Sequence, residues 1–218
     1  MTVNLQKGQK VDLRKSDGSS LKRVIVGLGW DMALEGHSID CDASAFACKG
    51  GKLLDSGDIV YFGHLQHKSG SIIHTGDNLT GEGDDEQIIV DFRKLPNEYD
   101  KIIFVVNIYD SSQRKQHFGM IQNAFIRIVD AESNTEFCKY DLTENYDGMT
   151  AMIFDEIYLR NGQWKFNVIG QGTKASRIEE LALRFKSNRK GLEYFESIQK
   201  LSTLELEMLM SSEFCFAA

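Results

Sequence analysis

The sequence concentrates chemically active side chains in one short acidic segment, GDNLTGEGDDE, which spans residues 76–86. The segment contains no Lys or Arg, and its carboxylates belong to Asp77, Glu82, Asp84, Asp85 and Glu86. Two carboxylates about 5 Å apart repel each other by roughly 3 kcal/mol at an effective dielectric constant of about 20. The segment is therefore either disordered and solvated, or neutralised by a cation. In either case, removing one charge, as in Asp84→Asn, should not destabilise the metal-free protein.

Calcium is a cation that suits this segment. It takes about six to eight oxygen ligands from carboxylates, amides, backbone carbonyls and water, and Gly-containing loops allow such oxygens to converge. Asn78 adds an amide oxygen to the carboxylates. The segment is not an EF-hand, because that pattern would place a ligand at Leu79 and a Gly at Glu82, and it lacks the Gly-Lys-Ser/Thr of a P-loop. The composition leaves a disordered acidic loop open as the alternative.

Further oxygen ligands occur at or near the ends of other predicted strands. Asp40 and Asp42 lie two residues apart in SIDCDASAF, so on a strand their side chains project from one face while that of Cys41 projects from the other. Asp31 ends the segment GLGWD, and Asn107 lies near the end of the most apolar run, in VVNIYD. Each of these residues suits a pre-positioned metal site, and each equally suits an exposed strand face or a turn.

The composition is that of a soluble globular protein and disfavours several classes of function. The net charge of −7 and the pI near 5.3 argue against nucleic acid or an anionic membrane as the main partner, because those partners need a basic surface. We expect a cytoplasmic protein with no transmembrane segment, since the sequence shows neither a long apolar run nor a signal peptide. The cysteines form no C-x-x-C pair, which argues against a zinc knuckle, a redox motif and a disulfide framework; they are Cys41, Cys48, Cys138 and Cys215.

Short β-branched and aromatic runs, separated by Gly, Asn and Asp clusters, predict the elements that position these residues. Their spacing is typical of a mainly β protein with an antiparallel β-sandwich. The run IIFVV is apolar throughout, which predicts a central strand, whereas FIRIV and WKFNV alternate as half-exposed strands do. The predicted strands cover residues 23–30, 58–65, 87–92, 101–109, 124–131, 136–142, 151–159 and 164–170.

From about Thr173 the apolar period becomes helical, which predicts C-terminal helices. Ser176 and Glu179 have the spacing of a capping box, and Gly191 separates two helical stretches. The apolar positions of these stretches are Ile178, Leu181 and Phe185, then Leu192, Phe195, Ile198, Leu201 and Leu204. The two interpretations are that the helices pack on the sandwich, or that they dock on a partner or a second copy.

Many segments in order resemble the TerD family of tellurium-resistance and stress-response proteins. They include GLGWD, IDCDASAF, HTGDNLTGEGDDE, DKIIFVVNIYD, QHFGMIQNAFIRIVD and TAMIFDEIYLRNGQWKFNVIGQG. The resemblance covers residues 1–172, which we interpret as a calcium-binding β-sandwich, and leaves residues 173–218 as a helical extension. It implies a protein of tellurite, phage and colicin resistance or of a related stress response, with no catalytic activity.

The resemblance also implies a set of metal-binding residues. The acidic calcium loop of the family falls on Asp77, Asn78, Glu82, Asp84, Asp85 and Glu86, its D-x-D-A-S element falls on Asp40 and Asp42, and Asp31 and Asn107 match supporting positions. Family members commonly read GDNLTGEGDGDDE, so the loop is two residues shorter here. This leaves open whether a second, adjacent calcium site exists.

Two functions follow from these residues. The first is a non-enzymatic calcium-binding stress-response protein, a sensor or adaptor that binds calcium ions and protein partners of a resistance complex. The alternative is a metal-dependent hydrolase in which the acidic loop holds a catalytic divalent cation and His74, next to the loop, acts as a base. Direct tellurite chemistry by thiols is disfavoured by the scattered cysteines.

Overall fold

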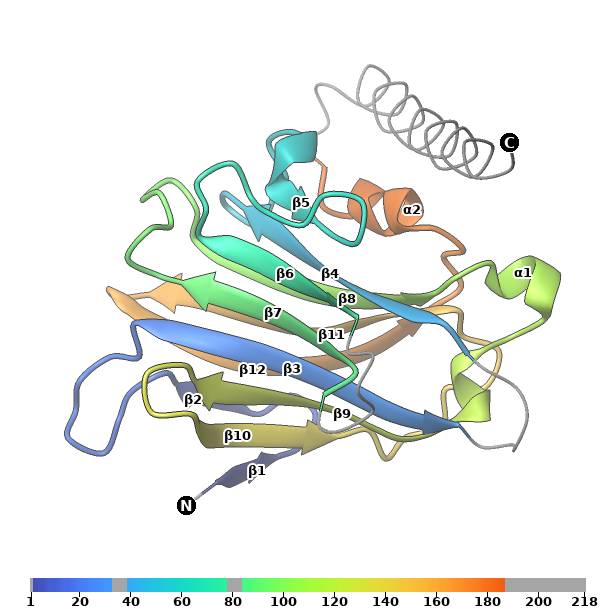
Figure 1. The fold of residues 1–218 in the computed structure, drawn as a ribbon, viewed down its shortest axis with the longest axis horizontal. Helices are drawn as coiled ribbons and strands as arrows, with labels where there is room; N and C mark the ends of the chain where they lie inside the picture. Colours follow the sequence, from blue (N-terminus) through green and yellow to red (C-terminus); the bar gives the residue numbers. More distant parts are fainter. Residues whose placement is uncertain (1, 33–38, 78–83, 187–218) are drawn as a thin grey trace, which may run out of the picture.

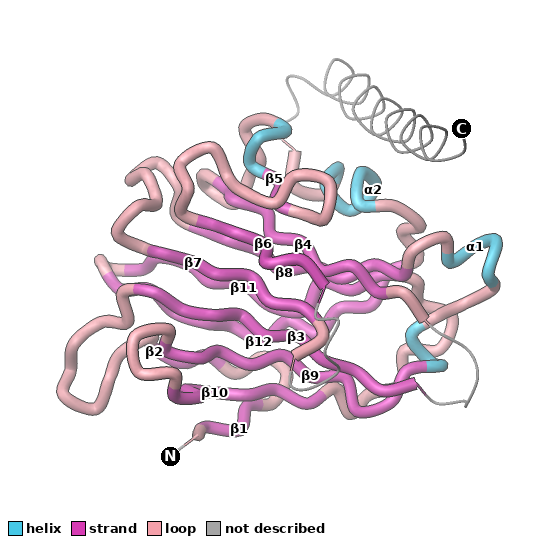
Figure 2. The backbone as a smooth tube through the Cα atoms, viewed as in Figure 1, coloured by secondary structure: helices cyan, strands magenta, loops and turns pink. Residues whose placement is uncertain are grey.

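The computed structural model describes residues 2–32, 39–77 and 84–186. Within these ranges the chain forms two six-stranded sheets that pack face to face, and helices occupy only the periphery (Figures 1 and 2). The predicted mainly β sandwich is confirmed. None of the helices in these ranges is long and apolar enough to cross a membrane.

The first sheet has the strand order β1-β10-β9-β3-β7-β6, and its neighbours are antiparallel except for β1 with β10. The second sheet has the order β2-β12-β11-β8-β4-β5 and is antiparallel. The strands of the first sheet are β1 (Val3–Leu5), β3 (Arg23–Met32), β6 (Ile72–Asp77), β7 (Glu86–Asp91), β9 (Ile121–Asp130) and β10 (Thr135–Asp141). Those of the second are β2 (Lys10–Asp12), β4 (Cys41–Cys48), β5 (Ile59–Val60), β8 (Lys101–Ile108), β11 (Ala151–Arg160) and β12 (Gln163–Thr173).

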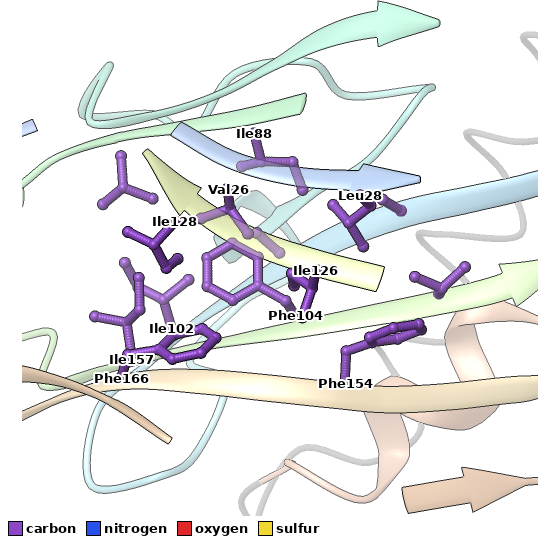
Figure 3. Close-up of a cluster of buried hydrophobic side chains, with 14 of the residues drawn as sticks. Val26, Leu28, Ile88, Ile102, Phe104, Ile126, Ile128, Phe154, Ile157 and Phe166 are labelled. Carbon is purple, nitrogen blue, oxygen red and sulfur yellow. The ribbon is translucent and has the colours of Figure 1, made fainter. Parts of the chain in front are cut away.

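The core between the sheets forms from alternate residues of facing strands. Figure 3 shows Val26, Leu28 and Ile88 from the first sheet packed with Ile102, Phe104 and Phe166 from the second. β8 lies between β4 and β11 and is buried on both faces, which explains its continuous apolar run KIIFVVNI. The prediction of a central strand here is confirmed.

A second apolar cluster, which we call the outer core, lies on the other face of the second sheet. There Ile103 and Val105 of β8 pack with Leu181 and Ala182 of helix α2 (Ile178–Leu183). The first predicted helix therefore packs on the sandwich. The other helices are short: α1 (Ser111–Arg114) and the 3₁₀ turns η1 (Ser56–Asp58) and η2 (Phe118–Met120).

Two local predictions were wrong. The helix α2 follows Arg177, one residue later than a capping box from Ser176 requires, so the hydroxyl of Ser176 donates to Glu180 at 3.1 Å rather than capping the helix with Glu179. Of the predicted strand 58–65, only β5 forms, because the chain turns back at Tyr61, whose N–H donates to the His64 carbonyl at 3.1 Å. The second predicted helix, beyond Gly191, lies outside the described residues.

Candidate functional site

The predicted ligands gather at one end of the sandwich. Antiparallel pairing places Glu86, at the start of β7, opposite Leu28 near the end of β3. In the second sheet it places Asp42, near the start of β4, opposite Asn107 near the end of β8. Figure 1 shows these four strand ends on the same side of the molecule. Asn78, Glu82 and the side chain of Asp77 lie outside the described part of the chain.

Asp84 is an acid of the segment that is held by other side chains. Its side chain is fully buried, Oδ1 accepts a hydrogen bond from Arg127 Nε at 2.7 Å, and Oδ2 accepts one from Gln87 Nε2 at 3.1 Å. Burial lowers the pKa of Arg127, but the hydrogen bond and charge of Asp84 outweigh it and raise that pKa overall. Arg127 lies on β9, far from the acidic segment in the sequence, and thus places a positive charge beside it. The expectation that Asp84→Asn leaves the metal-free protein no less stable is therefore revised.

Gly27 makes room for this buried carboxylate. A Cβ atom built on Gly27 would lie 2.1 Å from Asp84 Oδ2 and 2.4 Å from its Cγ, which no real contact permits. The glycine therefore allows Asp84 to lie flat on β3 while it reaches Arg127 on β9.

We expect Gly27→Ala to destabilise the protein by about 1–3 kcal/mol, because the new methyl group must displace Asp84 from its place. Chemical denaturation of the two proteins measures this difference. An unchanged free energy of unfolding would mean that Asp84 does not pack against β3 in solution.

Asp85 retains part of the predicted repulsion. Its Oδ2 accepts a hydrogen bond from the Trp30 N–H at 2.7 Å, and its side chain is half-buried. Burial raises the pKa of Asp85, the charges of Asp31 and Asp84 raise it further, and the Trp30 bond offsets only part of this effect. A cation beside Asp85 would relieve the repulsion among these three acids.

Glu86 joins the two sheets. It is buried, and its Oε2 accepts a hydrogen bond from the N–H of Ala43 on β4. β5 pairs only with Ala45 and Phe46 of β4, so it does not use this N–H. The same oxygen lies 3.6 Å from Nε2 of His74, too far for a hydrogen bond. His74 is itself buried, and its Nδ1 accepts from the Gly76 N–H at 2.9 Å. This geometry ties His74 to the backbone of the acidic segment instead of presenting it as a base at the surface.

The remaining predicted ligands lie on the rim. Asp31 is exposed and accepts a hydrogen bond from Asn123 Nδ2 at 2.8 Å. Asp40 is also exposed, and its Oδ2 lies 3.8 Å from Nη1 of Arg114. The side chain of Cys41 points into the core between the sheets, as the alternation in IDCDASAF predicts.

Electrostatics show that these acids share one region. Burial raises the pKa of the Cys41 thiol well above its ordinary value, and the charges of nearby carboxylates add to the shift. In order of effect, these carboxylates are Asp42, Glu86, Asp40 and Asp85. Acids from both sheets therefore act on a single buried group.

The acids do not all face the same side. Gly27 lies on the outer face of the first sheet, since its two neighbours in β3 belong to the core between the sheets, and Asp84 packs against it. Asp42 lies on the outer face of the second sheet, because Cys41 beside it points inward. Among the described residues, no three His, Cys, Asp or Glu side chains form a metal site. A calcium site at this end would therefore draw donor atoms from residues 77–83 as well.

Sequence reasoning missed Arg127, Gln87 and Gly27. The only signal was the alternation of FIRIV, which places Arg127 on the polar face of its strand. That pattern does not indicate that β3 is the single strand between β9 and β7, or that β3 carries a glycine where Asp84 reaches Arg127.

Comparison with known proteins places this fold. The model of the TerD domain family matches residues 1–185. The stress response protein SCP2 of Bacillus subtilis (strain 168) is 46% identical over 199 residues, with 85% of this chain and 100% of that protein covered. The tellurium resistance protein TerD of Serratia marcescens is 47% identical over 176 residues, with 79% of this chain and 91% of that protein covered.

Two solved structures share the fold. The unknown-function protein SAV2460 superimposes with a TM-score of 0.62 at 20% identity, covering 77% of this chain and 99% of that one. A homologue of telluride resistance protein, SCO6318 from Streptomyces coelicolor A3(2), gives a TM-score of 0.56 at 21% identity, covering 73% of this chain and 95% of that one.

Proposed function

The chain belongs to the TerD family, and from this premise we propose that it is a non-enzymatic calcium-binding stress-response protein of the cytoplasm, in which calcium orders the acidic segment as a sensor or adaptor for protein partners. Relatives of this family are named tellurium resistance and stress response proteins. The cytoplasmic placement is supported by the described cysteines, Cys41, Cys48 and Cys138, which are free and buried.

The observation that carries the calcium proposal is the place of Asp85, a half-buried carboxylate whose pKa is raised by burial and by the charges of Asp31 and Asp84. Asp84 and Glu86 already bond to Arg127 and to the Ala43 N–H, so they anchor the segment to both sheets. Asp85 lies between these anchors with a raised pKa. A carboxylate held by its neighbours on a rigid framework, and still repelled by other acids, is suited to a hard divalent cation.

The oxygen ligands in this proposal come from three places. Asp31 and Asp85 would serve from the first sheet. Asp40, Asp42 and Asn107 would serve from the second sheet only for an ion at the strand ends between the two sheets, because Asp42 and Asp84 lie on opposite outer faces. Asp77, Asn78 and Glu82 of the acidic segment would complete the shell, with Asp84 and Glu86 as the anchors. The bound ion would neutralise the charge of the carboxylates. The chain's own residues would hold the acidic segment in its orientation toward a partner.

We expect calcium to raise the melting temperature of the wild-type protein by roughly 5–10 °C. A ligand that binds only the folded state at 100 times its Kd stabilises it by about 2.7 kcal/mol, and each kcal/mol shifts the melting temperature of a protein of this size by about 2–4 °C. In Asp85→Asn the calcium-dependent rise should shrink. The same variant in chelator should be no less stable than wild type, since its repulsion with Asp31 and Asp84 falls.

Melting curves with chelator, with millimolar calcium and with millimolar magnesium measure these effects. Magnesium should give the smaller rise, because it demands a stricter octahedral shell. Asp141→Asn is the matched control, since Asp141 is an exposed acid paired with Lys139 at 2.7 Å, and it should keep the full calcium effect. A wild-type curve that calcium does not shift would refute the calcium proposal.

A further inference from the structure

Large apolar side chains remain exposed beside the outer core of the second sheet. Leu54 and Leu183 are each 44% exposed, and Phe62 is 53% exposed. We call these three residues the apolar rim. Leu183 lies on α2, and Leu54 and Phe62 lie in the chain before and after β5. Figure 1 places β5 and α2 on the side of the molecule opposite β1.

The members of the rim adjoin one another through the outer core. The Leu53 N–H donates to the Phe185 carbonyl at 2.8 Å, so the chain after α2 runs directly beside Leu54. The rings of Tyr61 and Phe62 are in contact at 5.3 Å, and Tyr61 packs against the same outer core as Phe185. The rim therefore borders one continuous apolar surface.

The chain leaves the described structure at this same surface. Leu53 pairs in parallel with Lys186, the last described residue, and residues 187–218 follow. The family match ends at residue 185, so this tail is additional to the shared domain. Its sequence carries apolar residues at helical spacing: Leu192, Phe195, Ile198, Leu201 and Leu204.

We propose that residues 191–210 of the tail dock as an amphipathic helix on the apolar rim of the same molecule. The tail begins at the rim, so its effective concentration there is on the order of millimolar, which favours it over a separate partner of similar chemistry. A 20-residue helix is about 30 Å long and can present its apolar positions along one face. Docking removes Leu54, Phe62 and Leu183 from water together with the apolar stripe of the tail.

Limited trypsin digestion of the full chain tests this proposal. Trypsin cleaves after Lys200, which lies between Ile198 and Leu201 in the docked stripe. We expect cleavage after Lys200 to be about tenfold faster in Phe62→Asp than in wild type, because the variant loses one buried apolar contact of the docked state. Mass spectrometry of the time course gives the rates.

Val3→Asp is the matched control, since Val3 is also 44% exposed but lies on β1 at the far edge of the first sheet. It should digest like wild type. Leu204→Asp leaves the sandwich untouched, is not adjacent to the scissile Lys200–Leu201 bond, and should accelerate cleavage as Phe62→Asp does. Equal rates in wild type and both variants would overturn the proposal. Protection that disappears on dilution would overturn it as well, because it would mean that a second copy, and not the same molecule, covers the rim.

Discussion

Replacing Asp84 with Asn should lower the free energy of unfolding by about 1.5–3 kcal/mol, in chelator as well as in calcium, because hydrogen bonds to charged groups are lost at a buried site. The two carboxylate oxygens of Asp84 accept from Arg127 and from Gln87. Asparagine can keep both contacts only as hydrogen bonds to a neutral group, with its oxygen accepting from Arg127 and its NH₂ group donating to a turned Gln87 amide, so the charge-assisted bond at the buried site is lost. The charge of Arg127 also loses its closer partner and retains Glu136, at 3.2 Å.

Asp141→Asn provides the comparison for this prediction. Asp141 also forms an ion pair, with Lys139 at 2.7 Å, but its side chain is 56% exposed. Exposed pairs contribute about 0–1 kcal/mol, so this variant should change stability little. Urea denaturation of both variants, and of Arg127→Gln with and without Asp84→Asn, gives the coupling energy. Equal stability losses at the two aspartates, or no coupling between Asp84 and Arg127, would contradict the buried pair.

The contrast between Asp84 and Asp141 shows which features of the structure can be predicted from the sequence. The strands were predictable where one face or both faces are apolar, as in the run of β8, and the inward direction of Cys41 followed from simple alternation. The pair of Asp84 with Arg127 was not predictable, because it depends on which strands are neighbours. The order β9-β3-β7 and the missing side chain at Gly27 bring the two residues together.

β11 shows a different limit. Its sequence AMIFDEIYL predicts a regular strand in which Phe154 and Glu156 share one face. The pairing of β11 with both neighbours shifts register between Ile153 and Asp155, so a β-bulge reverses the alternation from that point. Asp155 then lies opposite Phe104 and Val168, both in the core between the sheets, and its side chain points inward. No local signal in the sequence marks this bulge.

Asp155 should make the protein less stable as the pH rises. It is fully buried, and neither carboxylate oxygen has a hydrogen-bond partner among the described residues. Burial raises its pKa well above the ordinary value, and the charge of Glu156 adds to this. The nearby Cys138 thiol, whose pKa burial and the charge of Asp155 raise to about 12, offers no neutralising cation. The folded state therefore keeps the proton of Asp155 at a pH at which the unfolded chain has released it.

This difference fixes the sign of the pH dependence. The folded state binds more protons than the unfolded state, so the contribution of Asp155 is fully present below the ordinary aspartate pKa of about 3.9 and is lost as the pH rises toward the raised value. Within that window the slope is about 1.4 kcal/mol per pH unit. Asp155→Asn removes the titration, so its stability relative to wild type should increase steadily from pH 5 to pH 8.

Asp130 supplies a control of opposite sign. It is also buried, but hydrogen bonds from Ser133 and Lys15 outweigh the effect of burial and lower its pKa. Its contribution is present above the ordinary aspartate pKa and is lost as the pH falls, so Asp130→Asn should cost most stability near neutral pH and least near pH 3. Urea denaturation across this range measures both variants against wild type. A constant difference between Asp155→Asn and wild type from pH 5 to pH 8 would mean that Asp155 is ionised, and therefore solvated or paired, in the folded protein.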